Sequence, residues 1–144
     1  MPHLEVQQDE FLISSDPALL DLEAIFYFLE QTYWGRNRSR EVMRKALQNS
    51  FCFGVYQNRE QIGFARVITD FATYAYLADV YILEPFRKKG LGKRLIQIIL
   101  EHPELKGIRR WALITRDAQD LYKSVGFREL ENPERHMEIR RSDA

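Results

Sequence analysis

Cysteine is nearly absent from this sequence of 144 residues. Cys52 is the only one, so no disulfide can form within the chain. It lies in the apolar run Phe51-Cys52-Phe53, where we expect a small buried side chain rather than a reactive thiol. The three histidines, His3, His102 and His136, show no metal-ligand spacing. We therefore expect no metal site.

Long apolar runs and an excess of charge of either sign are also missing. No stretch approaches the roughly 20 apolar residues that a membrane-spanning helix needs, and residues 1–10 lack the apolar centre of a secretory signal. Lys plus Arg and Asp plus Glu each number 21, so the formal net charge is zero. This balance argues against a general nucleic-acid binder. We expect a soluble, cytoplasmic protein with neither a membrane nor a nucleic acid as partner.

The chain reads as one domain over residues 1–144. Its hydrophobic fraction of 45% is that of a globular protein, and no repeat or linker divides it. Asp16-Pro17 resembles a helix start, and apolar residues at helical spacing continue to about Thr32. Ser39 can cap a second helix with an apolar face that ends at Leu47.

Alternating and β-branched residues predict strands over residues 11–14, 51–56, 62–69 and 74–83, the last three as an antiparallel meander. In the second half, strands over 109–115, 127–130 and 136–140 alternate with helices that start near residue 91 and over 117–125. A helix between two strands favours a parallel crossover. The pattern therefore predicts an α/β (α+β) fold whose sheet is antiparallel first and has a parallel pair later.

Residues 79–94 are the most informative segment, because a strand runs into a glycine-containing turn and then into a helix. The first turn of a helix has unpaired N–H groups and the positive end of the helix dipole. Gly90 and Gly92 let a phosphate approach the backbone, since no Cβ is in the way. Five cationic side chains surround them: Arg87, Lys88, Lys89, Lys93 and Arg94. We interpret the segment as a pyrophosphate-binding turn, with a solvated basic turn as the alternative.

A second segment, residues 118–127, combines a short helix with a glycine stop. Leu121 and Val125 lie on one side of this helix, and Gly126 ends it. By composition alone, Tyr122 is an aromatic residue at the edge of the core.

Together and in this order, the two segments resemble the motifs of the GNAT acetyltransferase superfamily. The pattern R/Q-x-x-G-x-G/A reads here Arg87-Lys88-Lys89-Gly90-Leu91-Gly92, and A-x-x-L-Y-x-x-x-G-F reads Ala118 to Phe127. The stretches YWG, GFARVITD and YLADVYI are similar to a small bacterial branch. The resemblance implies a mixed sheet of about seven strands with helices on both faces. It also implies that strands 74–83 and 109–115 splay apart.

The resemblance implies acetyl-coenzyme A as the cosubstrate; the absence of a metal is expected from the histidine spacing alone. Its pyrophosphate would lie on Arg87, Lys88, Lys89, Gly90, Leu91, Gly92 and Lys93. Its pantetheine arm would follow the main chain of Tyr81, Ile82 and Leu83, with an N–H near Ile82 polarising the thioester carbonyl. Many members have an asparagine that contacts pantetheine at the position of Thr115, whose hydroxyl replaces only one of the two hydrogen bonds.

The same resemblance places Tyr122 at the general acid. The reference pKa of tyrosine, about 10, exceeds that of a thiol, about 8.5, so we expect Tyr122 mainly to hydrogen-bond the leaving sulfur. The acceptor amine must lose a proton before it attacks. Asp79 is the leading candidate base, three residues before Ile82, with a structural acceptor role as an equal alternative. Asp70 and Glu84 are weaker candidates.

The acceptor pocket of the family is usually built by the first two helices and their loop, here residues 33–38. Arg36 and Arg38 would hold an anionic group of the acceptor, while Tyr33 and Trp34 would form an apolar wall or an amine cage. Alternatively, the aromatics pack on the sheet and the arginines are solvated. Arg66 is either a further anion contact or an exposed strand residue.

The resemblance thus implies an N-acetyltransferase that acts on a primary amine of a small molecule. Two alternatives stay open. One is acetylation of protein lysines or N-termini, and the other is a non-catalytic coenzyme A-binding module. A homodimer is expected from the family.

Overall fold

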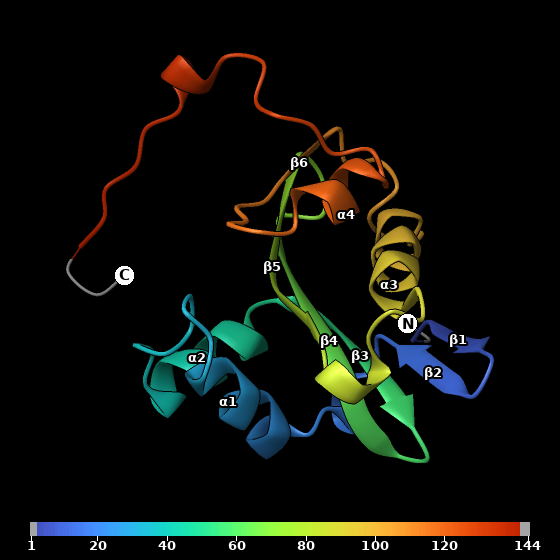
Figure 1. The fold of residues 1–144 in the computed structure, drawn as a ribbon. Helices are drawn as coiled ribbons and strands as arrows, with labels where there is room; N and C mark the ends of the chain where they lie inside the picture. Colours follow the sequence, from blue (N-terminus) through green and yellow to red (C-terminus); the bar gives the residue numbers. More distant parts are fainter. Residues whose placement is uncertain (1–2, 142–144) are drawn as a thin grey trace.

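The computed structural model describes residues 3–141 (Figure 1). The strands are β1 (Glu5–Gln8), β2 (Phe11–Ser14), β3 (Phe51–Gln57), β4 (Glu60–Thr69), β5 (Tyr74–Ile82) and β6 (Arg110–Ala112). The α-helices are α1 (Leu22–Glu30), α2 (Arg40–Gln48), α3 (Leu91–Leu100) and α4 (Gln119–Lys123). Three 3-10 turns, η1 (Pro17–Leu19), η2 (Glu84–Phe86) and η3 (Pro133–Arg135), complete the described elements.

The strands form one mixed sheet in the order β1-β2-β3-β4-β5-β6. Neighbours are antiparallel from β1 to β5, and β6 is parallel to β5. The parallel pairing covers only residues 74–76 of β5, opposite 110–112. Because β5 continues to Ile82 without β6 beside it, the two strands part. The predicted α/β class, the antiparallel first half and the splayed parallel pair are confirmed.

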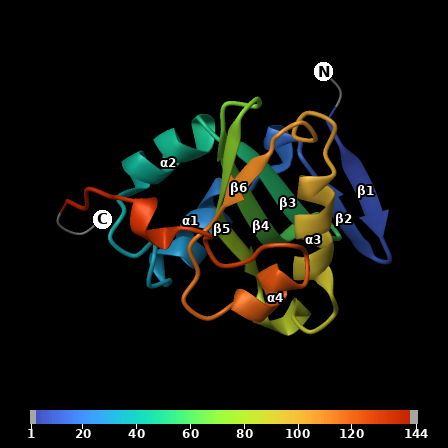
Figure 2. The same ribbon diagram turned by 90° about the horizontal axis from the view of Figure 1, so that it is seen from above.

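Helices cover both faces of the sheet, as Figures 1 and 2 show: α1 and α2 lie on one face, and α3 and α4 on the other. Each face has its own apolar cluster. Cys52 belongs to the cluster under α1 and α2, whereas Phe53 belongs to the cluster under α3. Successive strand residues point to opposite faces, which explains this division. Burial of each large apolar side chain contributes roughly 1.5–3 kcal/mol.

Local capping explains where the helices of the first half begin. Ser39 accepts a hydrogen bond from Val42 N at the start of α2, as predicted. The helix expected from Asp16-Pro17 is divided in two. Asp16 caps only η1, and Asp21 caps α1 by accepting from Ala24 N. Two aspartate caps therefore follow each other closely, and the second one starts the longer helix.

The sheet differs from the prediction at both ends of the chain. The expected strands 127–130 and 136–140 do not form, so the described sheet has six strands rather than about seven. Their alternating pattern is suited to a strand, but a strand needs a neighbour to hydrogen-bond to. Conversely, β1 was not predicted, because its sequence Glu-Val-Gln-Gln is polar. It forms through antiparallel pairing with β2.

Candidate active site

A cavity of about 560 Å³ lies beside the part of β5 that β6 leaves uncovered. Its walls come from α1 and the following loop, β5, η2, the turn before α3, and α4. The residues are Phe28, Trp34, Val80, Tyr81, Ile82, Phe86, Arg87, Lys88, Gly90, Leu91, Gly92, Lys93, Asp117, Ala118, Leu121 and Tyr122. Most of the residues predicted for the cosubstrate thus meet in one cavity; Lys89 is exposed outside it.

The N-terminus of α3 is open toward this cavity. Gly90 stands at the N-cap with φ +78°, and no side chain caps the helix there. The first hydrogen bond of the helix runs from Arg94 N to Gly90 O, 3.0 Å. A Cβ on Gly92 would meet Ile82 and Leu121 only at 3.9 Å, so space remains at the backbone. The first turn can therefore receive an anionic group.

The free edge of β5 directs one backbone N–H into the same region. Leu83 N donates to Ile62 O of β4 at 2.8 Å. Successive residues of a strand direct their N–H groups to opposite sides, so the N–H of Ile82 faces away from β4. Arg87 Nε donates to Ile82 O at 2.7 Å, which ties the basic turn to the end of the strand. Ile82, rather than Leu83, has the available N–H.

A β-bulge in β5 explains why the strand bends away. The register with β4 shifts between Phe64 and Arg66, so that Asp79 and Val80 together oppose a single residue, Ala65. Asp79 adopts φ +54° there, a left-handed conformation that aspartate tolerates better than most residues. Bulges increase local twist and bend the strand that carries them.

The Asp79 carboxylate is the centre of a buried polar cluster. It accepts hydrogen bonds from Trp34 Nε1 (2.8 Å), Arg38 Nη1 (3.0 Å to each oxygen) and Arg66 Nε (2.8 Å), and its side chain is only 2% exposed. Arg66 is itself buried and also donates to Ser50 Oγ. Both oxygens are engaged, which favours the structural alternative for Asp79 over the base. Arg66 is neither an exposed strand residue nor an open anion contact.

Of the predicted acceptor-side residues, Trp34 alone lines the first cavity, and aromatic contacts join its loop to neighbouring elements. Phe28 stacks on Tyr81 with ring centroids 3.8 Å apart. Tyr33 packs edge-on against Trp34, and the Arg116 guanidinium lies 3.8 Å over the Tyr33 ring. Tyr33 Oη also accepts from Arg116 N at 3.3 Å, which links the loop after α1 to the segment after β6. Arg36 is exposed and does not line the cavity.

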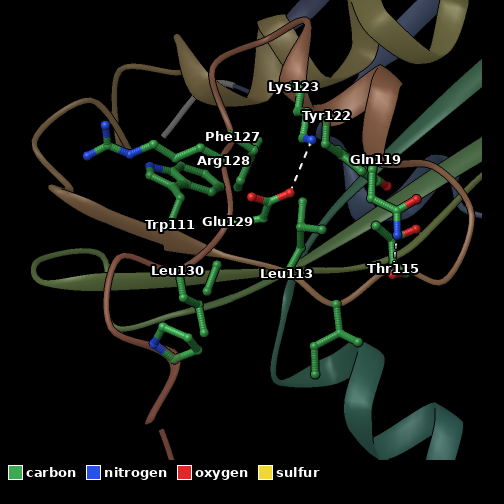
Figure 3. Close-up of a pocket in the computed structure, with 13 residues that line it drawn as sticks. Trp111, Leu113, Thr115, Gln119, Tyr122, Lys123, Phe127, Arg128, Glu129 and Leu130 are labelled. Carbon is green, nitrogen blue, oxygen red and sulfur yellow. Dashed lines mark hydrogen bonds and ion pairs between the residues drawn. The ribbon is translucent and has the colours of Figure 1, made fainter. Parts of the chain in front are cut away.

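Tyr122 lines this cavity and also a second one of about 470 Å³ (Figure 3). Burial raises the pKa of Tyr122 to about 12, and nearby Tyr33 and Asp117 add to the rise. The phenol is therefore protonated throughout the neutral range. Thr115 lines the second cavity and not the first, and its Oγ1 accepts from Ala118 N at 3.1 Å. Its hydroxyl is thus used at the start of α4.

Six residues of the first cavity were not predicted from the sequence: Phe28, Val80, Phe86, Asp117, Ala118 and Leu121. Ala118 and Leu121 belong to the second motif, which was a usable signal. Phe28 lies off the predicted apolar side of its helix. An aromatic residue in that position is a weaker signal of a site than the motif is. Among residues 3–141, no group of His, Cys, Asp or Glu is arranged to hold a metal ion. No helix in the same range is long and apolar enough to span a bilayer.

Comparison with known proteins points in the same direction as the geometry. The model of the acetyltransferase (GNAT) family matches residues 17–127. A Gibberella zeae protein provisionally named an acetyltransferase is 34% identical over 144 residues, which covers 83% of this chain and 80% of that protein.

Solved structures show the same fold. A GNAT-family structure from Xanthomonas campestris pv. campestris has a TM-score of 0.89 and 38% identity, covering 93% of this chain and 95% of the other. An acetyltransferase of Clostridium acetobutylicum, solved with acetyl-CoA, has a TM-score of 0.66 and 14% identity over 90% of this chain and 94% of that one. The second likeness is one of fold alone.

Proposed function

The chain belongs to the GNAT acetyltransferase family and is an acyltransferase, and from this premise we propose that it transfers an acetyl group from acetyl-CoA to a primary amine of a small molecule. The amine attacks directly, through a tetrahedral intermediate. Residues 1–144 act as a single catalytic domain, and the cytoplasmic location stays a prediction from the sequence.

The juxtaposition of three donors around one cavity carries this proposal. The uncapped first turn of α3, the outward N–H of Ile82 and the phenol of Tyr122 line the same space. The first suits a pyrophosphate, because backbone N–H groups and the helix dipole favour negative charge there. The second suits an oxygen that becomes negative when a thioester is attacked. The third suits a departing sulfur.

The reaction balances with these residues in those roles. The amine nitrogen forms a C–N bond to the acetyl carbon, and the C–S bond breaks with its electron pair on sulfur. A primary ammonium loses two protons to become an amide: one ends on the thiol and one goes to solvent. Tyr122 donates a hydrogen bond to the sulfur, and the Ile82 N–H donates to the carbonyl oxygen.

The contacts of the loop 33–38 support a small acceptor over a protein side chain. The Asp79 carboxylate accepts hydrogen bonds from Trp34 and Arg38 of the loop 33–38 and so holds the loop in place. Tyr33 of the same loop contacts Arg116 across from it. Because these contacts hold the loop at both ends, they support a bounded acceptor site over an open groove for an extended peptide.

Coenzyme A binding and amine-dependent thiol release test the proposal separately. Calorimetry with coenzyme A examines the α3 turn, and a panel of primary amines with acetyl-CoA, read by thiol release, examines turnover. We expect binding together with release for small amines. Binding without release from any small or peptide amine would reduce the chain to a coenzyme A-binding module. Absence of binding would reject the site altogether.

A further inference from the structure

Tyr33 and Arg116 join two loops on the side of the sheet that carries α1 and α2. Tyr33 belongs to the loop after α1, and Arg116 to the segment between β6 and α4, which reaches toward that loop in Figures 1 and 2. Tyr33 Oη accepts a hydrogen bond from Arg116 N at 3.3 Å. The guanidinium carbon of Arg116 lies 3.8 Å from the centroid of the Tyr33 ring. These two contacts hold the guanidinium in place although Arg116 is exposed.

The pair lies directly beside the first cavity. Trp34 lines that cavity, and its ring packs edge-on against Tyr33 with centroids 5.1 Å apart. Asp117, the residue after Arg116, lines it as well. Tyr33 is also one of the groups that raise the pKa of Tyr122, so the two phenols are near each other. The guanidinium therefore stands at the margin of the cavity, on the side of the loop 33–38.

Stacking on the ring leaves the hydrogen-bond donors of Arg116 unused. The N–H groups of a guanidinium lie in its plane, whereas an aromatic ring covers one of its faces. Within residues 3–141, no carboxylate pairs with Arg116, and no acceptor takes a hydrogen bond from its side chain. A guanidinium that is held in place and has free in-plane donors matches a carboxylate, which it can bind through two parallel hydrogen bonds.

The other cationic groups of the site are engaged elsewhere. Arg38 and Arg66 donate hydrogen bonds to the buried carboxylate of Asp79. The cations that line the cavity itself belong to the turn before α3 and to the start of that helix, which suit a pyrophosphate: Arg87, Lys88 and Lys93. Arg116 adds a positive charge on the acceptor side, where an anionic part of the acceptor can reach it.

We propose that the acceptor is a primary amine with a carboxylate at its other end, and that Arg116 binds this carboxylate. Because an acceptor class has meaning only for an acetyltransferase, this assignment rests on the proposed function. Anion binding is then the task of the segment after β6, and not of Arg36 and Arg38 in the loop 33–38. Tyr33 positions the guanidinium. Arg116 does not touch the reacting atoms, so its role is the choice of amine.

Turnover of paired amines tests the assignment. Amino acids with the amine and the carboxylate at opposite ends of a short unbranched chain are compared with alkylamines of the same length, by thiol release from acetyl-CoA. We expect the native protein to favour the amino acid in kcat/KM by roughly 10- to 100-fold, the range for a hydrogen bond to a charged group. Equal values overturn the assignment and leave the proposed function intact. If no amine is acetylated, the proposed function fails and the assignment with it.

Arg116→Gln removes the charge and keeps a long polar side chain. It should abolish the preference by lowering kcat/KM for the amino acid, while the value for the alkylamine changes by less than about twofold. An equal loss for both amines would mean that Arg116 only holds the loop, and would contradict the assignment. Arg109→Gln is the matched control, because Arg109 is exposed and lines neither cavity. This variant should keep the preference.

Binding of the reaction products gives a readout that does not depend on turnover. The acetylated amino acid and the acetylated alkylamine are titrated by calorimetry into protein saturated with coenzyme A. We expect the charged product to bind at least about tenfold more tightly, and Arg116→Gln to remove this difference. Arg116→Glu should instead favour the product of a diamine, whose free end is cationic. Equal affinities of the native protein for the charged and the neutral product contradict the assignment.

Discussion

At the scale of single residues, the pKa of Tyr122 decides which role its phenol can have. Burial raises its pKa to about 12, whereas a thiol has a pKa of about 8.5. Full transfer to a thiolate is then uphill by about 5 kcal/mol, since each unit of pKa corresponds to 1.36 kcal/mol. In this structure, therefore, Tyr122 is suited to donate a hydrogen bond to the sulfur rather than to give up its proton.

Tyr122→Phe is expected to lower kcat about 10- to 100-fold, near or below the lower end of the range for full general acid catalysis. The Kd for coenzyme A, measured by calorimetry, should change little, because the phenol is not part of the α3 turn. Tyr27→Phe, on the exposed side of α1, is the matched control. Unchanged turnover in the Tyr122 variant would remove the residue from the mechanism.

Cys52 should be chemically silent in the folded protein. Burial raises the pKa of its thiol to about 12, and the thiolate is the reactive form. We expect no reaction with an aromatic disulfide reagent at pH 8 in the native state, and one equivalent of reaction in urea. Rapid native labelling would show that the strand pair β3–β4 opens readily.

At the scale of elements, Asp79 holds β4, β5 and the loop after α1 in one arrangement. Removal of one partner from a buried ion pair leaves an uncompensated charge and costs about 3–5 kcal/mol. Asp79→Asn preserves the shape and tolerates the left-handed backbone, but it leaves Arg66 without its anion. We expect a loss of this size in the free energy of unfolding, measured with urea.

The matched control removes the same charge at the surface. Glu129→Gln breaks the exposed pair with Lys123 and should change the free energy of unfolding by less than about 1 kcal/mol.

Trp34→Phe distinguishes a structural role of Asp79 from a role as general base. If the carboxylate positions the loop, Trp34→Phe and Asp79→Asn both raise the acceptor KM. Loss of turnover in Asp79→Asn alone, with normal stability, would restore the base assignment.

A substitution in the first turn of α3 can weaken coenzyme A binding without destabilising the fold. A Cβ at Gly92 makes only ordinary contacts at 3.9 Å, and alanine has a helix propensity up to about 1 kcal/mol better than glycine. Gly92→Ala should therefore keep or raise the melting temperature. We expect it to raise the Kd for coenzyme A about tenfold, equivalent to 1.4 kcal/mol, because the Cβ stands where the phosphate approaches.

Gly107→Ala provides the comparison, since a Cβ there meets nothing within 4 Å and the residue lines neither cavity. It should leave the affinity for coenzyme A unchanged. Equal affinity for Gly92→Ala and the native chain would argue that the pyrophosphate does not lie on this turn.

At the scale of the whole molecule, buried tyrosines should make the fold sensitive to alkaline pH. Burial raises the pKa of Tyr56, Tyr81 and Tyr122. Below pH 10 all three are protonated in both states, and their contribution to stability is fully present. As pH rises above 10, the unfolded chain ionises first, so the free energy of unfolding falls until the folded groups ionise.

Urea midpoints measured between pH 8 and pH 12 check this direction. We expect a plateau up to about pH 10, the reference value for tyrosine, and a decline above it, accompanied by a delayed tyrosinate absorbance change in the native protein. Tyr56→Phe should flatten the decline, because it removes one of the groups whose pKa burial raises. The substitution breaks no hydrogen bond, since the buried hydroxyl has no partner among the described residues. Constant stability to pH 12 would mean that these phenols are open to water.

Local patterns determined much of this protein. The meander β3–β4–β5, the cap of α2 and the glycine turn before α3 follow from neighbouring residues, because alternation, capping and glycine conformations are short-range effects. For the same reason the residues of both motifs can be located in the sequence alone. The family and the α/β class are confirmed, while the roles of the individual site residues stay proposals.

Tertiary structure alone decided how distant residues meet. The sequence does not identify the hydrogen-bond partners of Asp79. In the structure these are Trp34, Arg38 and Arg66, which lie 45, 41 and 13 residues away along the chain. No local spacing encodes such pairs, because their formation depends on the bulge in β5 and on the packing of two elements. The alternation of residues 136–140 likewise predicts a strand, but it does not supply a neighbour, and no strand forms there. A strand forms only when another backbone offers hydrogen bonds, which is a property of the assembled fold.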